Sequence, residues 1–234
     1  MFSLIIPTYN ERTNIISLLE NIAEVLAKYP HEVIVVDDNS PDGTWQAIEE
    51  RSARDSRVHL VKRINERGLS SAVIEGFHHA TGDILGVMDA DHSHDIRLLP
   101  QMIDVISKNE ANFVVGSRRI AGGGADKWPW YRRLFSNIAT VLASFLTGVK
   151  VYDPMSGFFC LKREIYESSA PYLKPKGYKI LLEILAKAKD VQVAELPYIF
   201  VDRKQGYSKL SMNVITSFGE QLFELFLFRL KPRS

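Results

Sequence analysis

Short apolar runs alternate with amphipathic segments over about the first 120 residues of the chain. The runs are rich in Val and Ile and read as strands buried on both faces. They are Ser3–Pro7, Glu32–Val36, Val58–Val61, Ile84–Met88 and Phe113–Val115. Between them, apolar residues recur at helical spacing from Ile15 to Leu26, from Ala72 to Phe77 and from Leu98 to Ile106. Strands that alternate with helices predict an α/β fold with a mostly parallel sheet covered on both faces.

Polar residues follow four of these predicted strands. In such sheets ligands bind beyond the carboxyl ends of the strands, so these residues are candidates for a site. Surface turns also favour Asp, Asn, Pro and Gly, and any one cluster reads more simply as a turn. Their gathering at one edge of one sheet favours a site. The segments are Pro7-Thr8-Tyr9-Asn10-Glu11, Asp37-Asp38-Asn39-Ser40-Pro41-Asp42-Gly43, Asp89-Ala90-Asp91-His92-Ser93-His94 and Gly116-Ser117-Arg118-Arg119.

Asp89 and Asp91 form the most informative of these clusters. Two carboxylates two residues apart at a strand end can reach a shared centre, and a small set of oxygen ligands suits Mg²⁺ or Mn²⁺. The simpler alternative is capping of the following helix by Asp91 or Asp95. His92 and His94 fit a zinc site poorly and are expected to be exposed loop residues.

Several enzyme classes that use this edge of a sheet lack support in the sequence. The first strand is followed by neither the Gly-x-Gly-x-x-Gly of dinucleotide enzymes nor the basic glycine-rich loop of sugar nucleotidyltransferases, and no P-loop occurs. The Asp-x-Asp of aspartyl-phosphate phosphatases usually follows the first strand, whereas here it follows the fourth. Gly122-Gly123-Gly124 lacks the lysine of a phosphate-binding loop and reads as a mobile loop.

The composition of the chain bears on two questions, whether nucleic acid is a partner and whether the protein works in a reducing compartment. Hydrophobic residues are 46% of the 234 residues and the formal net charge is +1, which is ordinary for a globular protein and gives no reason to expect nucleic acid as a partner. The single cysteine, Cys160, is expected to be a buried, inert thiol, and a reducing compartment is permitted.

The termini bear on membrane association. The chain begins without the features of a signal peptide, and the apolar-rich stretch 134–149 is shorter than the ~20 residues of a spanning helix. These features predict a soluble or peripheral cytoplasmic protein.

Helical spacing resumes at Val214, and Leu225-Phe226-Leu227-Phe228 is apolar on every side. Arg229, Lys231 and Arg233 follow, as expected of a helix in the headgroup region of an anionic bilayer. We therefore expect a catalytic domain over residues 1–210 and an amphipathic interfacial helix with a basic tail over 211–234. A second helix, Trp130–Val149, is expected to form the other wall of a lipid entrance. The alternative is a helix end buried against the domain or a partner protein.

Taken together, the motifs resemble those of the inverting GT-A glycosyltransferases of family 2, and within them the dolichyl-phosphate mannosyltransferases. The resemblance extends from Ser3 to about Leu210. Beside the strand-end segments above, it rests on Ser40-Pro41-Asp42-Gly43-Thr44, Gly68-Leu69-Ser70-Ser71-Ala72, Trp128 to Arg132, Asp153-Pro154-Met155-Ser156-Gly157-Phe158, Val201-Asp202-Arg203 and Gly206-Tyr207-Ser208-Lys209-Leu210.

This resemblance implies a Rossmann-like GT-A fold, a GDP-mannose donor and a Mg²⁺ or Mn²⁺ cofactor. It implies that Asp89, Ala90 and Asp91, with Arg118, hold the diphosphate, and that Asp91, Asp89 and Ser93 surround the metal; some relatives have Gln in place of Ser93. The residues implied for guanosine are Pro7, Tyr9, Glu11, Val36 and Asp38.

The implied acceptor is a polyprenyl (dolichyl) phosphate at a membrane surface. Its phosphate is ionised near neutral pH, so it has to be held and aimed by cations rather than deprotonated by a strong base. Arg118, Arg132, Arg203 and Lys209 are the candidates. In-line attack would invert the anomeric centre and give a β-linked mannosyl phosphate lipid. Because larger relatives add transmembrane helices, this chain resembles the single-domain type, for which a membrane-anchoring partner protein is possible.

Two alternatives stay open at this point. The base-contacting loops do not separate guanine from uracil, so a hexosyltransferase that uses a UDP-sugar fits the same fold. A non-catalytic sugar-nucleotide-binding subunit is disfavoured, because Asp89, Asp91, Arg118 and Lys209 are all intact.

Overall fold

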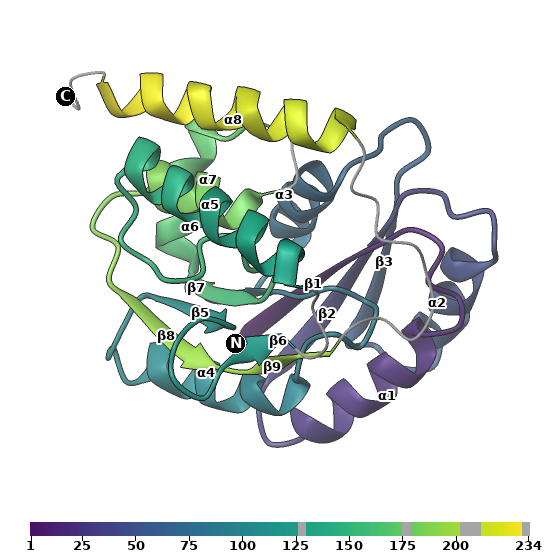
Figure 1. The fold of residues 1–234 in the computed structure, drawn as a ribbon. Coiled ribbons are helices and arrows are strands. Elements are labelled where there is room, and N and C mark those ends of the chain that lie inside the picture. The colour runs from purple at the N-terminus through teal and green to yellow at the C-terminus, as the bar shows by residue number, and fades with distance from the viewer. Residues whose placement is uncertain (126–129, 175–178, 202–211, 231–234) are drawn as a thin grey trace.

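The computed structural model describes residues 1–125, 130–174, 179–201 and 212–230, with the backbone alone for 130–136, 138 and 212–217. A seven-stranded sheet with the order β3-β2-β1-β4-β7-β5-β8 forms its centre (Figure 1). All neighbouring strands in it are parallel except β7, which runs antiparallel to both β4 and β5. The strands are β1 (Phe2–Thr8), β2 (His31–Asp37), β3 (Val58–Lys62), β4 (Ile84–Val87), β5 (Phe113–Ser117), β7 (Phe159–Lys162) and β8 (Val193–Pro197).

Helices cover both faces of this sheet, and a small parallel pair of strands, β6 (Gly124–Ala125) with β9 (Ile199–Phe200), lies beside it. Short 3₁₀ turns occur at Ile96–Leu98 and Ala170–Tyr172. The helices are α1 (Ile15–Val25), α2 (Thr44–Ser52), α3 (Leu69–His79), α4 (Leu99–Ser107), α5 (Trp130–Thr147), α6 (Arg163–Ser169), α7 (Ile180–Lys187) and α8 (Met212–Leu230).

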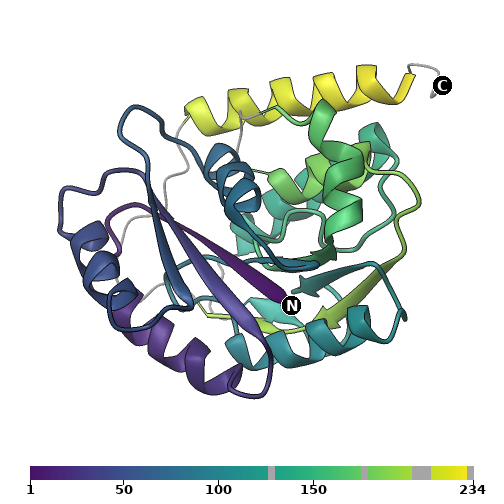
Figure 2. The same cartoon turned by 180° about the vertical axis from the view of Figure 1, so that it is seen from behind.

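Alternate side chains of each strand enter two separate cores. On β1, Leu4 and Ile6 pack against α1 and α4, whereas Ile5 between them packs on the side of α3 and α5 to α8. Because strand side chains alternate between faces, a strand buried on both faces has to be apolar at every position. This explains why the central strands read as continuous apolar runs. Figure 2, seen from behind, shows the same two helical layers.

The five predicted strands and the three predicted helices of the first half are confirmed, with ends shifted by a few residues. The helix expected over 130–149 is also present, as α5. The elements α2, β7, α6, α7 and β8 were not predicted. The strand β7 was missed because alternating strands and helices suggested only parallel neighbours. Its thiol, Cys160, is buried as expected, and burial raises the pKa of that thiol.

The C-terminal helix α8 packs on α5 and α7 through one face. Leu222 and Leu225 are buried in the core, and Gln221 donates to the Lys179 carbonyl (3.3 Å) and to the Glu183 carboxylate (3.4 Å). Glu183 is itself paired with Lys187 inside the protein. The opposite face of α8 leaves large apolar side chains exposed, namely Phe223, Leu227 and Leu230.

Leu225 and Leu227 make a matched pair on α8, because their side chains are 1% and 44% exposed. We expect Leu225→Ala to lower the free energy of unfolding by about 2–5 kcal/mol, through lost burial and a cavity. Leu227→Ala should change it by less than about 0.5 kcal/mol. Urea unfolding of both variants measures this difference, and equal losses would contradict the described packing of α8.

Candidate functional site

The loops after β1 and β2 are fastened to each other at the carboxyl edge of the sheet. The main-chain N–H of Asn10 donates to the Ser40 hydroxyl at 2.9 Å. The N–H of Glu11 donates to the Thr44 hydroxyl at 3.0 Å, and that of Arg12 to the Asp42 carboxylate at 3.1 Å. Asn10 and Asn39 both adopt positive φ angles, 61° and 52°, which asparagine tolerates better than most residues. The first loop therefore has a fixed path over the strand ends.

Asp37, at the end of β2, is a buried organiser of this region. Its carboxylate accepts from the Thr8 hydroxyl at 3.0 Å and from both the main-chain N–H and the hydroxyl of Ser40, at 2.8 and 2.6 Å. The side chain is fully used within the protein. Asp37 is thus a structural carboxylate, although it lies in the segment that sequence analysis singled out.

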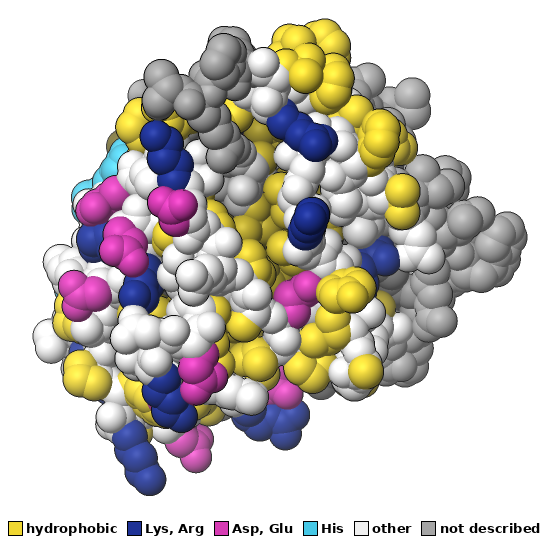
Figure 3. Space-filling model, turned by 90° about the vertical axis from the view of Figure 1, so that its left-hand side faces the viewer, with side chains coloured by type: hydrophobic (Ala, Val, Ile, Leu, Met, Phe, Trp, Pro, Cys, Tyr) yellow, Lys and Arg dark blue, Asp and Glu magenta, His cyan; other side chains and the backbone are white. Residues whose placement is uncertain are grey.

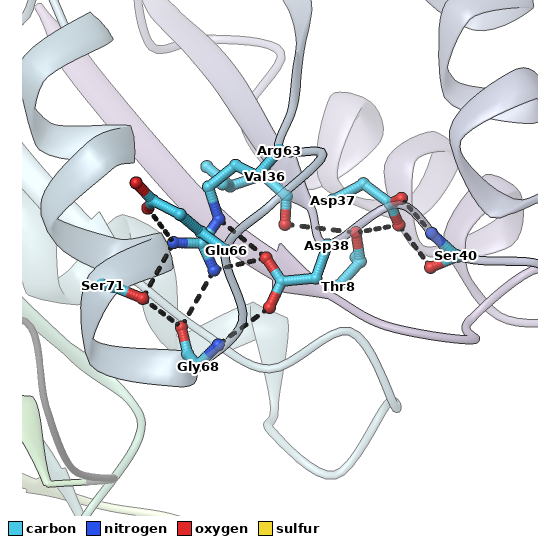
Figure 4. Close-up of polar contacts among 9 residues, drawn as sticks. All are labelled: Thr8, Val36, Asp37, Asp38, Ser40, Arg63, Glu66, Gly68 and Ser71. Atoms are coloured by element: carbon cyan, nitrogen blue, oxygen red, sulfur yellow. Dashed lines mark hydrogen bonds and ion pairs between the residues drawn. The ribbon is translucent and has the colours of Figure 1, made fainter.

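Asp38 turns the other way and pairs with Arg63 (Figure 4). Arg63 donates to Asp38 Oδ1 through Nε (2.7 Å) and Nη2, and the Gly68 N–H donates to Oδ2 at 3.0 Å. Arg63 also donates to the Gly68 carbonyl (3.1 Å) and the Ser71 hydroxyl (2.8 Å). Asp38 and Arg63 are both buried, so this pair fixes the loop between β3 and α3 against the end of β2.

The residues implied for the nucleoside lie around these two loops. Tyr9 is half-buried, and the Arg67 guanidinium lies 4.7 Å from the centre of its ring. Pro7 and Glu11 are also half-buried on the first loop. Val36 and Ala90 have side chains buried in the core, so only their main chains can face a nucleotide.

Asp89 and Asp91 lie in the loop after β4, beside β1 and the start of β7. The side chain of Asp89 is 29% exposed and approaches the ring of His94. Asp91 is buried, and its Oδ1 accepts from the Ser93 N–H at 3.1 Å. The cap of the following 3₁₀ turn is Asp95, whose side chain accepts from the Arg97 N–H. Asp91 is therefore not needed as a cap.

His94 corrects one expectation. His92 is exposed as predicted, but the prediction that His94 is exposed is wrong, because its ring is buried among aromatic side chains. Burial lowers the pKa of His94, against the opposing charges of Asp89 and Asp91. The local sequence does not show that this histidine is buried, because the aromatic side chains around it come from distant parts of the chain.

The donor set around Asp91 fits a hard divalent cation. Within the described residues no three His, Cys, Asp or Glu side chains gather as a metal site, so few protein ligands are available. The Ser93 hydroxyl is buried and makes no hydrogen bond with the described protein groups. A carboxylate with a neighbouring hydroxyl suits Mg²⁺ or Mn²⁺, which complete their shells with water and substrate phosphates.

Arg118, after β5, is held by a buried carboxylate. Asp153 Oδ2 accepts from Arg118 Nε at 2.7 Å and Oδ1 from Nη2 at 2.8 Å, and Oδ2 also accepts the Arg118 N–H. Burial alone would raise the pKa of Asp153, but the hydrogen bonds and charge of Arg118 outweigh it and keep that pKa below its usual range. Both groups are therefore charged at neutral pH, and the guanidinium has a fixed orientation.

Lys179, just before α7, is a second cation near this centre and was missed from sequence. Its ammonium donates to the Met155 carbonyl at 3.4 Å. Its pKa is lowered by burial and by the charge of Arg118, against the opposing charges of Asp89 and Asp153. Lys179 precedes the short, mostly apolar helix α7, and in the sequence it looks like an ordinary residue at a helix end.

The other predicted cations cannot be placed. Arg203 and Lys209 lie outside the described residues, and of Arg132 only the backbone, in α5, is described. The segment that leads toward Arg203 is tied to the acidic loop, since the Val201 N–H donates to the Ser93 carbonyl at 3.2 Å. Sequence reasoning also missed Arg63 and did not recognise that Asp153 orients Arg118, because such pairings are set by tertiary structure.

Comparison with known protein families gives one family match over most of the chain. The model of "Glycosyl transferase family 2" matches residues 3–169. A "Dolichol-phosphate mannosyltransferase" of Pyrococcus furiosus is 42% identical over 95% of this chain, which spans 63% of that relative's length. A protein of the same name from Saccharomyces cerevisiae is 40% identical over 97% of this chain and 88% of its own length.

Solved structures share the fold at lower identity. Glucosyl-3-phosphoglycerate synthase of Mycobacterium tuberculosis, in complex with Mn²⁺, UDP and its product, has a TM-score of 0.65 at 19% identity, over 100% of this chain and 81% of its own. A mannosyltransferase of Pyrobaculum calidifontis in complex with GDP-Man and Mn²⁺ has a TM-score of 0.65 at 22% identity, over 100% and 65%. The predicted GT-A fold, with a mixed, mostly parallel sheet and a C-terminal helix, is confirmed.

The buried pair of Arg63 and Asp38 gives a test of how the site loops are held. Arg63→Met should lower the free energy of unfolding by about 3–5 kcal/mol, because it leaves a buried carboxylate without its partner. The double variant Arg63→Met, Asp38→Asn should lose less free energy of unfolding than the sum of the losses in the two single variants. Urea unfolding of the four proteins of this cycle measures the coupling, and strict additivity would contradict a direct pair.

Proposed function

The chain belongs to glycosyl transferase family 2 and, within it, to the dolichol-phosphate mannosyltransferases, and from this premise we propose that it transfers mannose from GDP-mannose to a polyprenyl phosphate with inversion. The observation that carries the proposal is the meeting of two oppositely charged groups of residues at one sheet edge. Asp89 and Asp91 lie beside the fixed cation Arg118 and the half-buried Lys179. A diphosphate donor and a phosphate acceptor require such a combination.

The acceptor's chemistry requires cations that hold and orient it rather than a strong base. A phosphate monoester has its second pKa near 6, so it is a nucleophile at neutral pH without losing a proton to the enzyme. One of its oxygens forms a bond to the anomeric carbon while the bond from that carbon to the GDP oxygen breaks. The electron pair leaves with the diphosphate, and the anomeric centre inverts from α to β.

Arg118 is the best-placed described residue to aim the acceptor phosphate. Asp153 fixes the orientation of its guanidinium through two side-chain hydrogen bonds. Arg132, Arg203 and Lys209 are proposed to complete the cationic environment. Lys179 adds charge that favours anionic substrates near Asp89.

A divalent cation, Mg²⁺ or Mn²⁺, is proposed to be held by Asp91, with Asp89 and the Ser93 hydroxyl beside it. Such an ion supplies positive charge that offsets the growing negative charge of the departing diphosphate. Both structural neighbours described above are complexes with Mn²⁺, which supports this assignment. The proposed contacts of the nucleoside are with Tyr9, Glu11 and Asp38, and with the main chain at Pro7, Val36 and Ala90.

The acceptor's lipid tail leads us to propose docking at the cytoplasmic face of a membrane, through α5 and α8. No helix among the described residues has the length and apolar character to cross a bilayer. These two helices pack together, and the Phe145 carbonyl accepts from Arg229 at 2.9 Å. The exposed side chain of Phe145 (76%) adds to those of Phe223 and Leu227. Apolar side chains gather in the upper part of the face in Figure 3, with Lys and Arg side chains among them.

The transfer reaction itself is the decisive test. Purified protein with Mn²⁺ should transfer mannose from GDP-mannose to a polyprenyl phosphate and should leave UDP-glucose unused. Asp91→Asn should reduce transfer on the order of 100-fold or more, because it removes the main metal carboxylate. Chelation should stop the wild type reversibly.

Glu50→Gln, on the exposed surface of α2, is the matched control and should transfer at the wild-type rate. Transfer from UDP-glucose in preference to GDP-mannose would replace the proposed donor. Full activity in excess chelator would remove the metal from the mechanism.

Membrane docking is tested without truncating α8, which is part of the core. The triple variant Phe145→Ser, Phe223→Ser, Leu227→Ser should stay in solution in a flotation assay in which the wild type floats with anionic vesicles. Ile199→Ser removes an equally exposed apolar side chain on β9, away from α8 in Figure 1, and should float like the wild type. Flotation of the triple variant would refute this surface, and a wild type that does not float would favour an anchoring partner protein.

A further inference from the structure

Both ring nitrogens of His94 lie close to Asp89, and one of them is hydrogen-bonded to its main chain. The main-chain N–H of Asp89 donates to His94 Nδ1 at 3.1 Å, and His94 Nε2 lies 3.8 Å from Asp89 Oδ2. Since Nδ1 accepts a hydrogen bond, it carries a lone pair, and the ring proton of a neutral imidazole must be on Nε2. The N–H of the ring therefore faces the carboxylate, while the ring's acceptor faces the main chain of the same residue.

The aromatic surroundings of His94 fix the plane of its ring. The ring stacks on Phe158 with centroids 5.0 Å apart and an angle of 8° between planes. Tyr198 and Phe200 meet it edge-on at 5.7 and 6.1 Å. The imidazole is 1% exposed, so it has no freedom to follow a moving carboxylate.

The loop after β4 folds back on itself, so that Asp89 and His94 lie together although they are five positions apart in the sequence. His92 adopts φ 58°, and the Ser93 N–H donates to Asp91 Oδ1, so the chain folds back toward Asp89. A Cβ atom on Gly157 would lie 3.3 Å from Asp89 Oδ2 and 3.5 Å from His94 Cε1. The absence of a side chain at Gly157 thus leaves room where the carboxylate and the ring lie close together.

We propose that His94 is a positioning residue, which sets both the backbone and the carboxylate of Asp89 for the donor sugar and the metal. This inference rests on the proposed function in that Asp89 serves the transfer reaction. His94 itself touches no substrate in this assignment. Its effect is to keep the Asp89 carboxylate in a single orientation for the reaction.

Three substitutions separate the two ring contacts from the packing of the ring. His94→Phe keeps the aromatic stack and loses both polar contacts. His94→Asn places an amide oxygen where Nδ1 lies and can still accept the Asp89 N–H, whereas His94→Gln reaches only the position of Nε2. His92→Asn is the matched control, because His92 is exposed and asparagine tolerates its φ of 58°.

With GDP-mannose, Mn²⁺ and polyprenyl phosphate, His94→Phe should lower kcat on the order of 10- to 100-fold. The KM for polyprenyl phosphate should not change, and His94→Asn should lose less than His94→Gln. His92→Asn should react at the wild-type rate. ¹⁵N-histidine NMR of the wild type should show a neutral His94 ring protonated at Nε2.

Wild-type turnover by His94→Phe would overturn the positioning role, as would equal losses in the Asn and Gln variants or a ring protonated at Nδ1. If His94→Phe does not fold, the comparison of the Asn and Gln variants decides. A wild type that transfers no mannose would defeat the proposed function instead. The ring tautomer and the Mn²⁺ affinities of the Asn and Gln variants, measured by calorimetry with GDP, would then decide the positioning role separately.

Discussion

A sheet covered by helices on both faces can hold charged groups only at the ends of its strands, and the rest of this molecule follows from that constraint. The two cores take up the central side chains of β1 (Leu4–Ile6) and of β2 (Val33–Val36), so the polar residues of the site gather where these strands stop. Inserting β7 antiparallel between β4 and β5 brings the start of that strand to the same edge. The acidic loop after β4 and the segment before β7 thereby become neighbours, although about 60 residues separate them in sequence.

The carboxylates at this edge divide into two kinds by their partners. Asp37, Asp38 and Asp153 are occupied by hydroxyls, main-chain N–H groups and guanidinium groups of the protein, and they set the shape of the loops. Asp89 and Asp91 follow a strand that ends at the middle of the sheet, next to Arg118 and Lys179. Rigid loops on one side and a concentrated set of charges on the other give a site that can hold two anionic substrates without large rearrangement.

The sequence was most informative where one local pattern decides the structure. Continuous apolar runs identified β1, β2 and β4, and the acidic residues after them identified the edge of the sheet. Pairings between distant residues carried no such pattern: Arg63 resembles any surface arginine until it meets Asp38, 25 residues away. His94 was misassigned for the same reason, because its aromatic surroundings come from Phe158, just before β7, and from Tyr198 and Phe200 at β9. The antiparallel direction of β7 likewise depends on tertiary structure, because it follows from the position of this strand between β4 and β5.

The position of β7 also has a consequence for how the chain is made. The strands β1 to β4 can pair as soon as they leave the ribosome, whereas β5 has no neighbour in the sheet until β7 and β8 follow. While residues 118–158 are being synthesised, β4 and β5 each present an unpaired, apolar edge. During this interval the two unpaired edges are open to wrong strand pairing. The arrangement that assembles the charges of the site thus delays closure of the sheet until late in synthesis.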